Sequence, residues 1–448
     1  MKDITVSKAA QLCAGRIIGN MAEDREIGRV IIDSRVVEPG DMFVAYKGEK
    51  VDGHDYIPAA FAKGAACCLA ERAPEAADGP VILVADVQKA LEALARAYRE
   101  TLNIPVIGIT GSVGKTTAKE MVWWVLSQKL NVLKTEGNLN NQIGVPMTLS
   151  RIRPEHQAAV VEMGISGFGE MRELARMARP TIAVFTVIGH AHLEFLHDLE
   201  GVFRAKTEML ELMPEDGTVI VNGDDPWLKK INCRQRLICC GLGEDCQLRA
   251  ENISSLADGT TDFDIVYPDG RFRVHIPAHG RHLIYAAMEA AAVGMSLGLS
   301  NEEIARGIAA YKVMGRRGAL WSGDKLTLVD DSYNANPDSM RCAIDSMRDM
   351  PGRHVCVLGD MLEMGPEAGQ MHYELGKYAV ENGMELLLCC GELGRETARG
   401  AGGRGVWFES REELAKALPR FINQGDTVLV KASRGMHLEE IADELKRL

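Results

Sequence analysis

The residues with the clearest chemical meaning lie in TGSVGKTT (110–117), between the apolar run IPVIGIT (104–110) and AKEMVWWVLSQK. Glycines let backbone N–H groups wrap phosphate oxygens, and a following helix N-terminus favours negative charge. We therefore expect ATP phosphates to bind Gly111, Ser112, Val113, Gly114, Lys115, Thr116 and Thr117, with Lys115 on the β- and γ-phosphates and the Thr116 hydroxyl on Mg²⁺. Ile109 stands where a strict motif has its first glycine, so an ordinary glycine-rich turn is the alternative.

Polar residues end three further apolar runs. Glu162 closes AAVVEMG, His190 and His192 follow TIAVFTVIG, and GTVIVNGDD ends in Asn222 and Asp224. Ligands of open α/β sheets bind beyond the carboxyl ends of the strands, so these residues should converge with Thr110 and Thr186 on one crevice. Beside a phosphate loop, Glu162 is typical of a Mg²⁺ ligand, although a helix cap or surface position is the plain alternative.

Other candidates carry weaker signals. Two histidines at i, i+2 are common in solvated loops, and only their place at the sheet edge makes one a metal or phosphate contact. Spacing alone predicts that Lys206, in FRAKTE, is a surface lysine on a helix. Asp33-Ser34-Arg35 reads equally as turn chemistry or as a pocket for a phosphorylated ligand with Arg35 as its charged contact.

The elements that must position these residues fall into three segments. The first has apolar runs at 29–33, 41–45, 66–70 and 81–85, then a helix with Asp86 as N-cap, and a boundary near residue 100. The middle alternates strands with helices, including 284–298, which favours a mostly parallel sheet. After Gly315-Arg316-Arg317-Gly318 come runs at 326–331, 354–360, 385–390, 406–408 and 427–433, typical of a smaller doubly wound domain.

These patterns predict an α/β protein of three domains. They are a small N-terminal α/β domain (1–100), a central P-loop domain with a parallel sheet and helices (101–313), and a Rossmann-like C-terminal domain (314–448). The length of 448 residues suits three units of roughly 100–200 residues each.

Composition excludes several classes of function. A net charge of −12 makes nucleic acid an unfavourable partner. No signal peptide and no run of about 18 apolar residues appear, so we expect a cytoplasmic protein without membrane insertion. The eleven cysteines form no CxxC pair, which predicts free, mostly buried thiols in a reducing compartment.

Taken together, the motifs resemble the Mur ligase family over essentially the whole chain. The resemblance rests on eight ordered segments, among them GITGSVGKTTAKE, TEGNLNNQIGVPMTL, VVEMGISGFGEM, AHLEFLHDLEGVFRAKTEML, DDSYNANPDSM, VLGDMLEMG and DTVLVKASRGM. It implies one domain each for a UDP-sugar, ATP and an incoming amino compound. The implied reaction joins D-alanyl-D-alanine to UDP-N-acetylmuramoyl-tripeptide through an acyl phosphate, with ATP, Mg²⁺ and a monomeric enzyme.

The resemblance also implies roles for individual residues. Ser34 and Arg35 would contact the uridine end, and Thr116 and Glu162 would hold the Mg²⁺ shared by the β- and γ-phosphates. His192 and a carbamylated Lys206 would serve a second Mg²⁺. The residues that would approach the nucleotide from the third domain are Arg316, Asp331, Asn334 and Asn336.

Two departures concern the adenine contacts. Family members usually carry His-Asn-x-x-Asn where this chain has His282-Leu283-Ile284-Tyr285-Ala286, and Thr-Asn-Ile-Gly where it has Thr186-Val187-Ile188-Gly189. Other readings stay open at this point: the ligase that adds the third residue, a folylpolyglutamate or cyanophycin type of ligase, and a catalytically silent binder of UDP-muramoyl peptides. The identity of the third tripeptide residue, lysine or diaminopimelate, also stays open.

Overall fold

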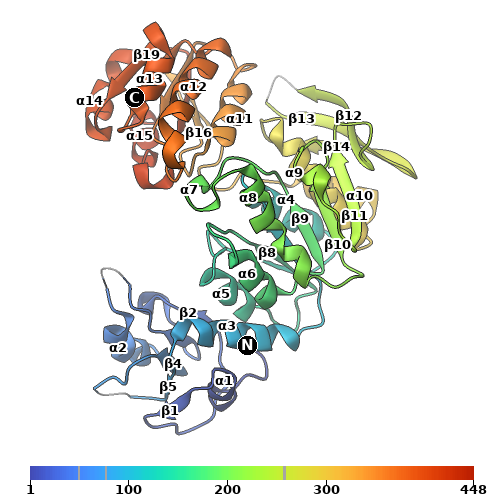
Figure 1. Ribbon diagram of the computed structural model, residues 1–448, viewed down its shortest axis with the longest axis vertical. Helices are drawn as coiled ribbons and strands as arrows, with labels where there is room; N and C mark the ends of the chain where they lie inside the picture. The colour runs from blue at the N-terminus through green and yellow to red at the C-terminus, as the bar shows by residue number, and fades with distance from the viewer. Residues whose placement is uncertain (49–50, 76–77, 256–258) are drawn as a thin grey trace.

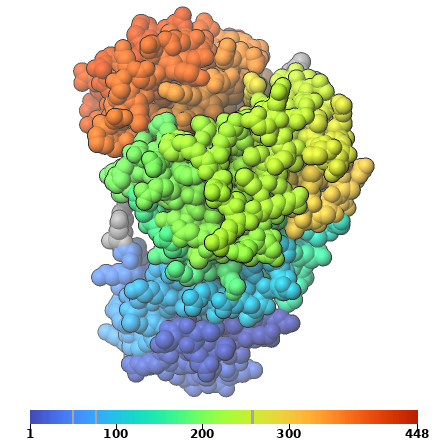
Figure 2. Space-filling model, turned by 45° about the vertical axis from the view of Figure 1, so that its right-hand side comes forward, coloured from blue at the N-terminus to red at the C-terminus, as the bar shows by residue number. Residues whose placement is uncertain are grey.

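Three lobes follow one another along the long axis of the molecule, the N-terminal lobe at one end and the C-terminal lobe at the other (Figure 1). The computed structural model describes residues 1–448 except 49–50, 76–77 and 256–258. The described residues form three sheets, of five, nine and six strands, and each sheet lies in its own stretch of the chain. The surfaces of the central and C-terminal lobes meet on the face in Figure 2.

The N-terminal lobe is a five-stranded sheet in the order β1-β5-β4-β3-β2, parallel except at β1. Its strands are short, and four of them follow the predicted apolar runs, whereas β1 was not predicted. They are β1 (Arg16–Ile18), β2 (Val30–Ile31), β3 (Met42–Val44), β4 (Cys67–Ala70) and β5 (Val81–Leu83). Helices α1 (Val6–Leu12) and α2 (Ile57–Ala62) complete it.

Helix α3 (Val87–Glu100) joins this lobe to the next. Asp86 caps it as predicted, its side chain accepting from the Lys89 N–H. Its buried face packs against the central helices α5 (Gly144–Ser150) and α6 (Glu170–Ala178), and the Tyr98 hydroxyl donates to the Ile152 carbonyl at 2.6 Å. One continuous apolar core therefore runs from the N-terminal lobe into the central lobe.

The central sheet runs β14-β13-β12-β11-β10-β9-β6-β8-β7 and is parallel from β7 to β12. Its parallel strands are β6 (Val106–Thr110), β7 (Val132–Lys134), β8 (Ala158–Glu162), β9 (Ile182–Phe185), β10 (Thr218–Asn222), β11 (Arg236–Gly241) and β12 (Leu248–Ser255). Strands β13 (Thr261–Tyr267) and β14 (Gly270–Ile276) extend it as an antiparallel ribbon. Apolar residues cover both faces, as a buried parallel sheet requires.

Helices lie on both faces of this sheet. The core on one face includes α4 (Lys115–Leu126), α9 (His282–Ser296) and α10 (Asn301–Ala309). The core on the other includes α5, α6 and α8 (Leu199–Thr207), and the short α7 (Leu193–Leu196) follows β9 towards the C-terminal lobe (Figure 1).

The C-terminal lobe is a doubly wound sheet in the order β15-β16-β20-β17-β18-β19, antiparallel only at β15. Its strands are β15 (Ala319–Ser322), β16 (Leu326–Asp330), β17 (His354–Leu358), β18 (Leu386–Cys390), β19 (Gly405–Phe408) and β20 (Asp426–Lys431). Helices α11 (Pro337–Met347), α12 (Ala368–Glu381) and α13 (Gly394–Gly400) pack on one face, and α14 (Arg411–Phe421) and α15 (Glu439–Leu445) on the other.

The predicted fold class is confirmed: three α/β units with a central P-loop sheet. The predicted free and mostly buried thiols are also confirmed, since all eleven cysteines are free and eight are buried. None of the described helices combines the length and the apolar character needed to cross a bilayer.

Candidate functional site

The P-loop backbone needs glycine at two places. Gly114 has φ 85° and is the N-cap of α4. Gly111 has φ 152°, and a Cβ there would lie 2.0 Å from Thr186 Oγ1. Lys115 Nζ folds back to donate to the Gly111 carbonyl at 2.7 Å. This strand–loop–helix geometry presents backbone N–H groups and one ammonium to a single point, which is the arrangement that binds phosphate.

Thr116 and Glu162 lie together beneath this loop. Thr116 Oγ1 is 3.0 and 3.2 Å from the two carboxylate oxygens of Glu162, whose side chain is 3% exposed. Asn140 Nδ2 donates to the same carboxylate at 2.8 Å, and Lys119 Nζ lies 3.6 Å away. The plain reading of Glu162 as a surface residue or helix cap is wrong, because the carboxylate is buried and points at the P-loop helix.

Lys206 is almost fully buried, with 1% of its surface exposed, so the prediction of a surface lysine is wrong. Spacing missed it because α8 packs against the core on the side that carries this residue. Burial holds the pKa of the Lys206 ammonium well below its ordinary value, and the Lys115 charge acts in the same direction. No hydrogen bond or ion pair joins this side chain to another described residue.

His192 lies near Lys206 and Lys115. Burial lowers the pKa of its imidazole, the Lys206 and Lys115 charges lower it further, and Glu363 opposes them. Its Nδ1 lies 2.5 Å from Glu363 Oε2 of the C-terminal lobe. Lys115, His192 and Lys206 thus converge from the P-loop, the loop after β9 and α8.

The loop after β9 supports the P-loop from the side. Thr186 Oγ1 donates to the Val113 carbonyl at 2.6 Å, and the Ser112 N–H donates to the Val187 carbonyl at 2.8 Å. The Ser112 hydroxyl exchanges two hydrogen bonds of 2.9 Å with the N–H and carbonyl of Gly189. The predicted convergence of strand ends therefore holds for β6, β8 and β9.

At the end of β10, Asp224 forms hydrogen bonds with neighbouring residues of the same lobe. Asp224 accepts from the Gly243 N–H and from the Tyr285 hydroxyl at 3.0 Å each. Leu283 and Ala286, where the family usually has asparagines, point into the apolar core on that face. His282 and Tyr285 are thus the side chains of this stretch that offer polar groups in α9's first turn. Burial, aided by Asp224, raises the pKa of the Tyr285 hydroxyl.

The residues of the C-terminal lobe that were predicted to contact the nucleotide form ion pairs and hydrogen bonds within that lobe. Arg316 donates to Asp330 at 2.9 Å and to Asp443 at 2.8 Å, and Asp331 pairs with Lys431 Nζ at 2.6 Å. Two asparagines serve backbone groups. Asn334 Oδ1 accepts from the Arg434 N–H at 3.3 Å, and Asn336 caps α11 by accepting from the Ser339 N–H. Their role at the nucleotide stays a prediction.

Arg317, which was not singled out from the sequence, differs from its neighbour Arg316. Its guanidinium lies 3.9 Å from the Tyr333 ring centroid, and among the described residues no carboxylate forms an ion pair with it. Burial lowers the pKa of the Lys115 ammonium, Glu162 opposes this, and the Arg317 charge lowers the pKa further, so Arg317 lies near the P-loop. No sequence signal separates the two adjacent arginines, because only the path of the linker decides which one turns towards the P-loop.

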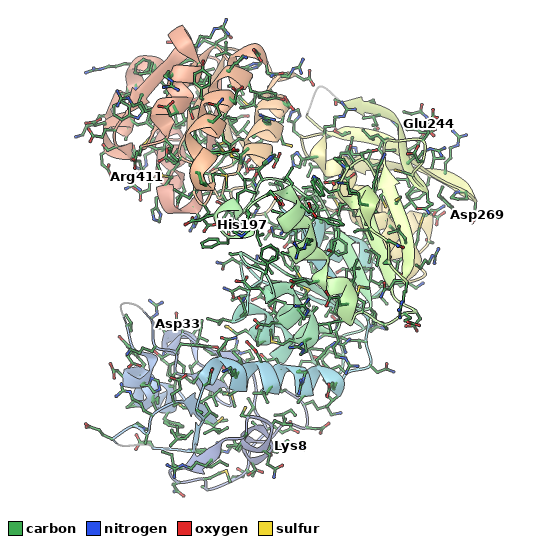
Figure 3. The ribbon with its side chains drawn as sticks, in the orientation of Figure 1. Lys8, Asp33, His197, Glu244, Asp269 and Arg411 are labelled. Carbon is green, nitrogen blue, oxygen red and sulfur yellow. The ribbon has the colours of Figure 1, made fainter. Side chains whose placement is uncertain are left out.

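Ser34 and Arg35 lie apart from all of these groups, in a one-turn helix of the N-terminal lobe that Asp33 caps. The Arg35 guanidinium is exposed and pairs with Asp33 at 2.7 Å. Hydrogen bonding from Arg35 lowers the pKa of the Asp33 carboxyl to about 2. Asp33 and His197, at the end of α7, lie on the same side of the molecule (Figure 3).

The structure thus brings one set of residues together around the P-loop and places two others in the outer lobes. Lys115, Thr116, Glu162, His192 and Lys206 surround one loop, whereas Ser34 with Arg35 and the group around Arg316 belong to the outer lobes. Sequence reasoning missed Asn140, Asp225 and Asp338. Each of them stands in a segment that the sequence analysis quotes. Their partners could not be found, because these contacts join segments that no local pattern connects.

The chain matches three domains of one family in order. Residues 26–99 match the Mur ligase family catalytic domain, 109–294 the Mur ligase middle domain, and 316–434 the Mur ligase glutamate ligase domain. The UDP-N-acetylmuramoyl-tripeptide--D-alanyl-D-alanine ligase of Bacillus subtilis is 37% identical, covering 98% of both chains. The Escherichia coli enzyme of the same name is also 37% identical, covering 100% of this chain and 99% of its own.

Solved structures agree with these matches. The crystal structure of MurF from Acinetobacter baumannii superposes with a TM-score of 0.91 at 32% identity, covering 99% of this chain and 98% of its own. MurF ligase from Thermotoga maritima, solved in complex with ADP, has a TM-score of 0.83 at 28% identity, covering 94% and 97%. The chain therefore belongs to the Mur ligase family.

Proposed function

We propose that this protein is the ligase that joins D-alanyl-D-alanine to UDP-N-acetylmuramoyl-tripeptide, forming ADP and phosphate, in the synthesis of peptidoglycan precursors. The Bacillus subtilis and Escherichia coli relatives, which match over nearly their whole length at 37% identity, are named as this ligase. The observation that supports catalysis most is the convergence of three basic groups, Lys115, His192 and Lys206. Burial lowers the pKa of His192 and of Lys206, and the charge of Lys115 lowers both further. Such a cluster is stabilised by anions, and the phosphates of ATP and an acyl phosphate supply them.

The donor set beneath the P-loop fits Mg²⁺. Thr116 and Glu162 offer a hydroxyl and carboxylate oxygens within 3.2 Å of each other, and hard Mg²⁺ prefers oxygen ligands, usually one or two carboxylates with substrate phosphates. A bound Mg²⁺ would supply positive charge to the β- and γ-phosphate oxygens. His192 with a carbamylated Lys206 would hold a second ion. A silent binder would have no use for this buried set, which disfavours that alternative.

The residues then align three substrates: ATP, the UDP-muramoyl tripeptide and the dipeptide. The terminal carboxylate of the tripeptide attacks the γ-phosphorus, the bond to the β-phosphate oxygen breaks, and ADP leaves. Lys115 and the P-loop N–H groups neutralise charge on the phosphate oxygens during this transfer. The dipeptide amine next attacks the carbonyl carbon of the acyl phosphate, and phosphate departs as the amine loses its proton. Holding the reacting atoms in line accounts for much of the rate gain.

The outer lobes hold the two ends of the substrates in this proposal. Ser34 and Arg35 contact the uridine end, since the exposed guanidinium suits a phosphorylated ligand. A cavity of about 430 Å³ lies where the C-terminal lobe meets α7, lined by Glu194, Met361, Leu362, Glu363 and Leu393 among others. Its apolar wall suits the methyl groups of the dipeptide, and its carboxylates suit the amine. We place the protein in the cytoplasm, acting as a monomer, by analogy with its family.

A mass-spectrometric assay tests the function directly. The protein is offered ATP, Mg²⁺ and D-alanyl-D-alanine with either the lysine- or the diaminopimelate-containing UDP-muramoyl tripeptide. We expect a pentapeptide product from one tripeptide, and phosphate release that depends on both substrates. Phosphate release without any dependence on D-alanyl-D-alanine, or no product from either tripeptide, would contradict the proposal.

A further inference from the structure

Three successive backbone N–H groups of the loop after β9 are each held by a different part of the molecule. The Ile188 N–H donates to Asp225 Oδ2 at 2.7 Å, within the central lobe. The Gly189 N–H donates to the P-loop hydroxyl of Ser112 at 2.9 Å. The His190 N–H donates to Asp338 Oδ2 of the C-terminal lobe at 2.5 Å. One peptide unit therefore separates the P-loop contact from the contact with the C-terminal lobe.

The contact with Asp338 is close. His190 Nδ1 lies 3.1 Å from the same carboxylate oxygen, and a Cβ on Gly189 would lie 2.4 Å from it. A side chain at 189 would thus push the carboxylate away, and glycine permits the approach. Asp338 Oδ2 thus contacts both nitrogens of His190, at 2.5 and 3.1 Å, and this fixes the position of the loop relative to helix α11.

Asp338 moves only with its lobe. It lies in the first turn of α11, whose start is fixed by Pro337 and by the reciprocal hydrogen bonds between Asn336 and Ser339. Helix α11 packs through Met340, Ile344 and Met347 into the core of the C-terminal lobe. The position of the Asp338 carboxylate therefore follows the position of the whole lobe.

We propose that Asp338 is a positioning residue which couples docking of the C-terminal lobe to the conformation of the P-loop, through His190, Gly189 and Ser112. When the lobe is docked, the loop after β9 is held from both sides and supports the Ser112 hydroxyl. When the lobe moves away, the His190 N–H loses its acceptor, and the P-loop loses part of its support. The catalytic consequence rests on the proposed function, but the coupling does not.

Hydrogen–deuterium exchange on the full chain without substrates tests this coupling. Asp338→Ala should raise exchange about tenfold in peptides covering 186–192 and also in those covering 108–118, although Asp338 lies in another lobe. Asp338→Asn keeps an oxygen that accepts from the His190 N–H and should restore much of the protection. The matched control is Asp345→Ala on the same helix, whose carboxylate accepts from the Tyr378 hydroxyl at 2.7 Å. It should change exchange only in the C-terminal lobe.

Faster exchange confined to the C-terminal lobe in Asp338→Ala would overturn the proposal, as would faster exchange at 186–192 with an unchanged P-loop. In the active enzyme, Asp338→Ala should lower kcat about tenfold while the fold remains intact. Because exchange is measured without turnover, its result stands even if the ligase assay fails, so the two proposals fail independently.

Discussion

Lys115 is the residue whose removal should affect catalysis most directly. Its ammonium already lies over the loop, 2.7 Å from the Gly111 carbonyl, and would turn to the γ-phosphate. Lys115→Ala should lower kcat by about 10² or more, because neutralisation of transition-state charge is lost, while the thermal transition stays in place. Lys89→Ala, which removes an exposed lysine of the N-terminal lobe, is the control. Wild-type turnover in folded Lys115→Ala would remove the basis for the loop assignment.

Lys206 should carry a carbamate. A buried ammonium beside Lys115 is repelled, whereas the neutral amine reacts with CO₂ to give an anionic, oxygen-rich group suited to Mg²⁺. Lys206→Ala should be folded and nearly inactive, with partial recovery when a short carboxylate is added. Lys206→Arg should also fail although it keeps the charge. Full activity of the arginine variant, or of enzyme stripped of CO₂, would show that the carbamate is not needed.

Leu283 and Ala286 should weaken selection of the base. Both side chains face the core where the family usually offers amides to adenine. Losing such a hydrogen-bonding group commonly removes about 1–3 kcal/mol of selectivity, so discrimination between ATP and GTP in kcat/KM should be modest. A preference of several orders of magnitude for ATP would mean that backbone groups or Tyr285 have replaced those contacts.

At the scale of elements, helix α9 carries an ionisable residue, Glu289, inside an apolar core. Glu289 is 1% exposed, its Oε1 has no hydrogen-bond partner among the described residues, and burial raises the pKa of its carboxyl well above the ordinary value. Above the ordinary pKa the unfolded chain gives up this proton while the folded chain keeps it. The free energy of unfolding therefore falls as pH rises from about 4 towards the folded-state pKa.

Glu289→Met should remove this penalty. The variant should be more stable than the wild type at pH 8 by about 1–3 kcal/mol, and the difference should shrink towards pH 4. Urea unfolding across this pH range measures it, with Glu381→Met on the exposed face of α12 as the matched control. Equal stability at every pH would mean that Glu289 finds a partner in solution.

At the scale of the whole molecule, α3 makes the N-terminal and central lobes one folding unit. The buried Arg99 donates to four carbonyls, of Ala178, Leu102, Ile104 and Arg179, at 2.7–3.3 Å. The C-terminal lobe has separate cores. We therefore expect two thermal transitions, one for the joined lobes and one for the C-terminal lobe.

Arg99→Met should move only the first of these transitions. Leaving buried carbonyls without donors costs about 1–3 kcal/mol, which scanning calorimetry resolves as a lower Tm. Arg96→Met, an exposed position one turn earlier on α3, should leave both transitions unchanged. A single transition, or an equal shift of both, would show that the three lobes unfold together.

The sequence by itself determined the parallel core and the phosphate loop. Apolar runs such as 104–110 and 158–164 bury both faces, so their period and length identify strands without tertiary information. Asp86 identified the start of α3, and Gly114 with Lys115 identified the P-loop, because capping and phosphate binding depend on adjacent residues. Strands β7, β11 and β12 of the same sheet were missed. Strands β13 and β14 were missed too, since their mixed polar pattern belongs to a ribbon with one face towards the core.

Only the tertiary structure decided which side chains meet. The burial of Lys206 depends on the face α8 turns to the core, and one helical spacing fits either face. Arg316 and Arg317 are equivalent in sequence, yet the linker turns one towards Asp443 and the other towards Tyr333. Asp338 reaches His190 across 148 positions of chain. Such contacts depend on how whole lobes pack together, and the pattern of neighbouring residues in the sequence does not predict that packing.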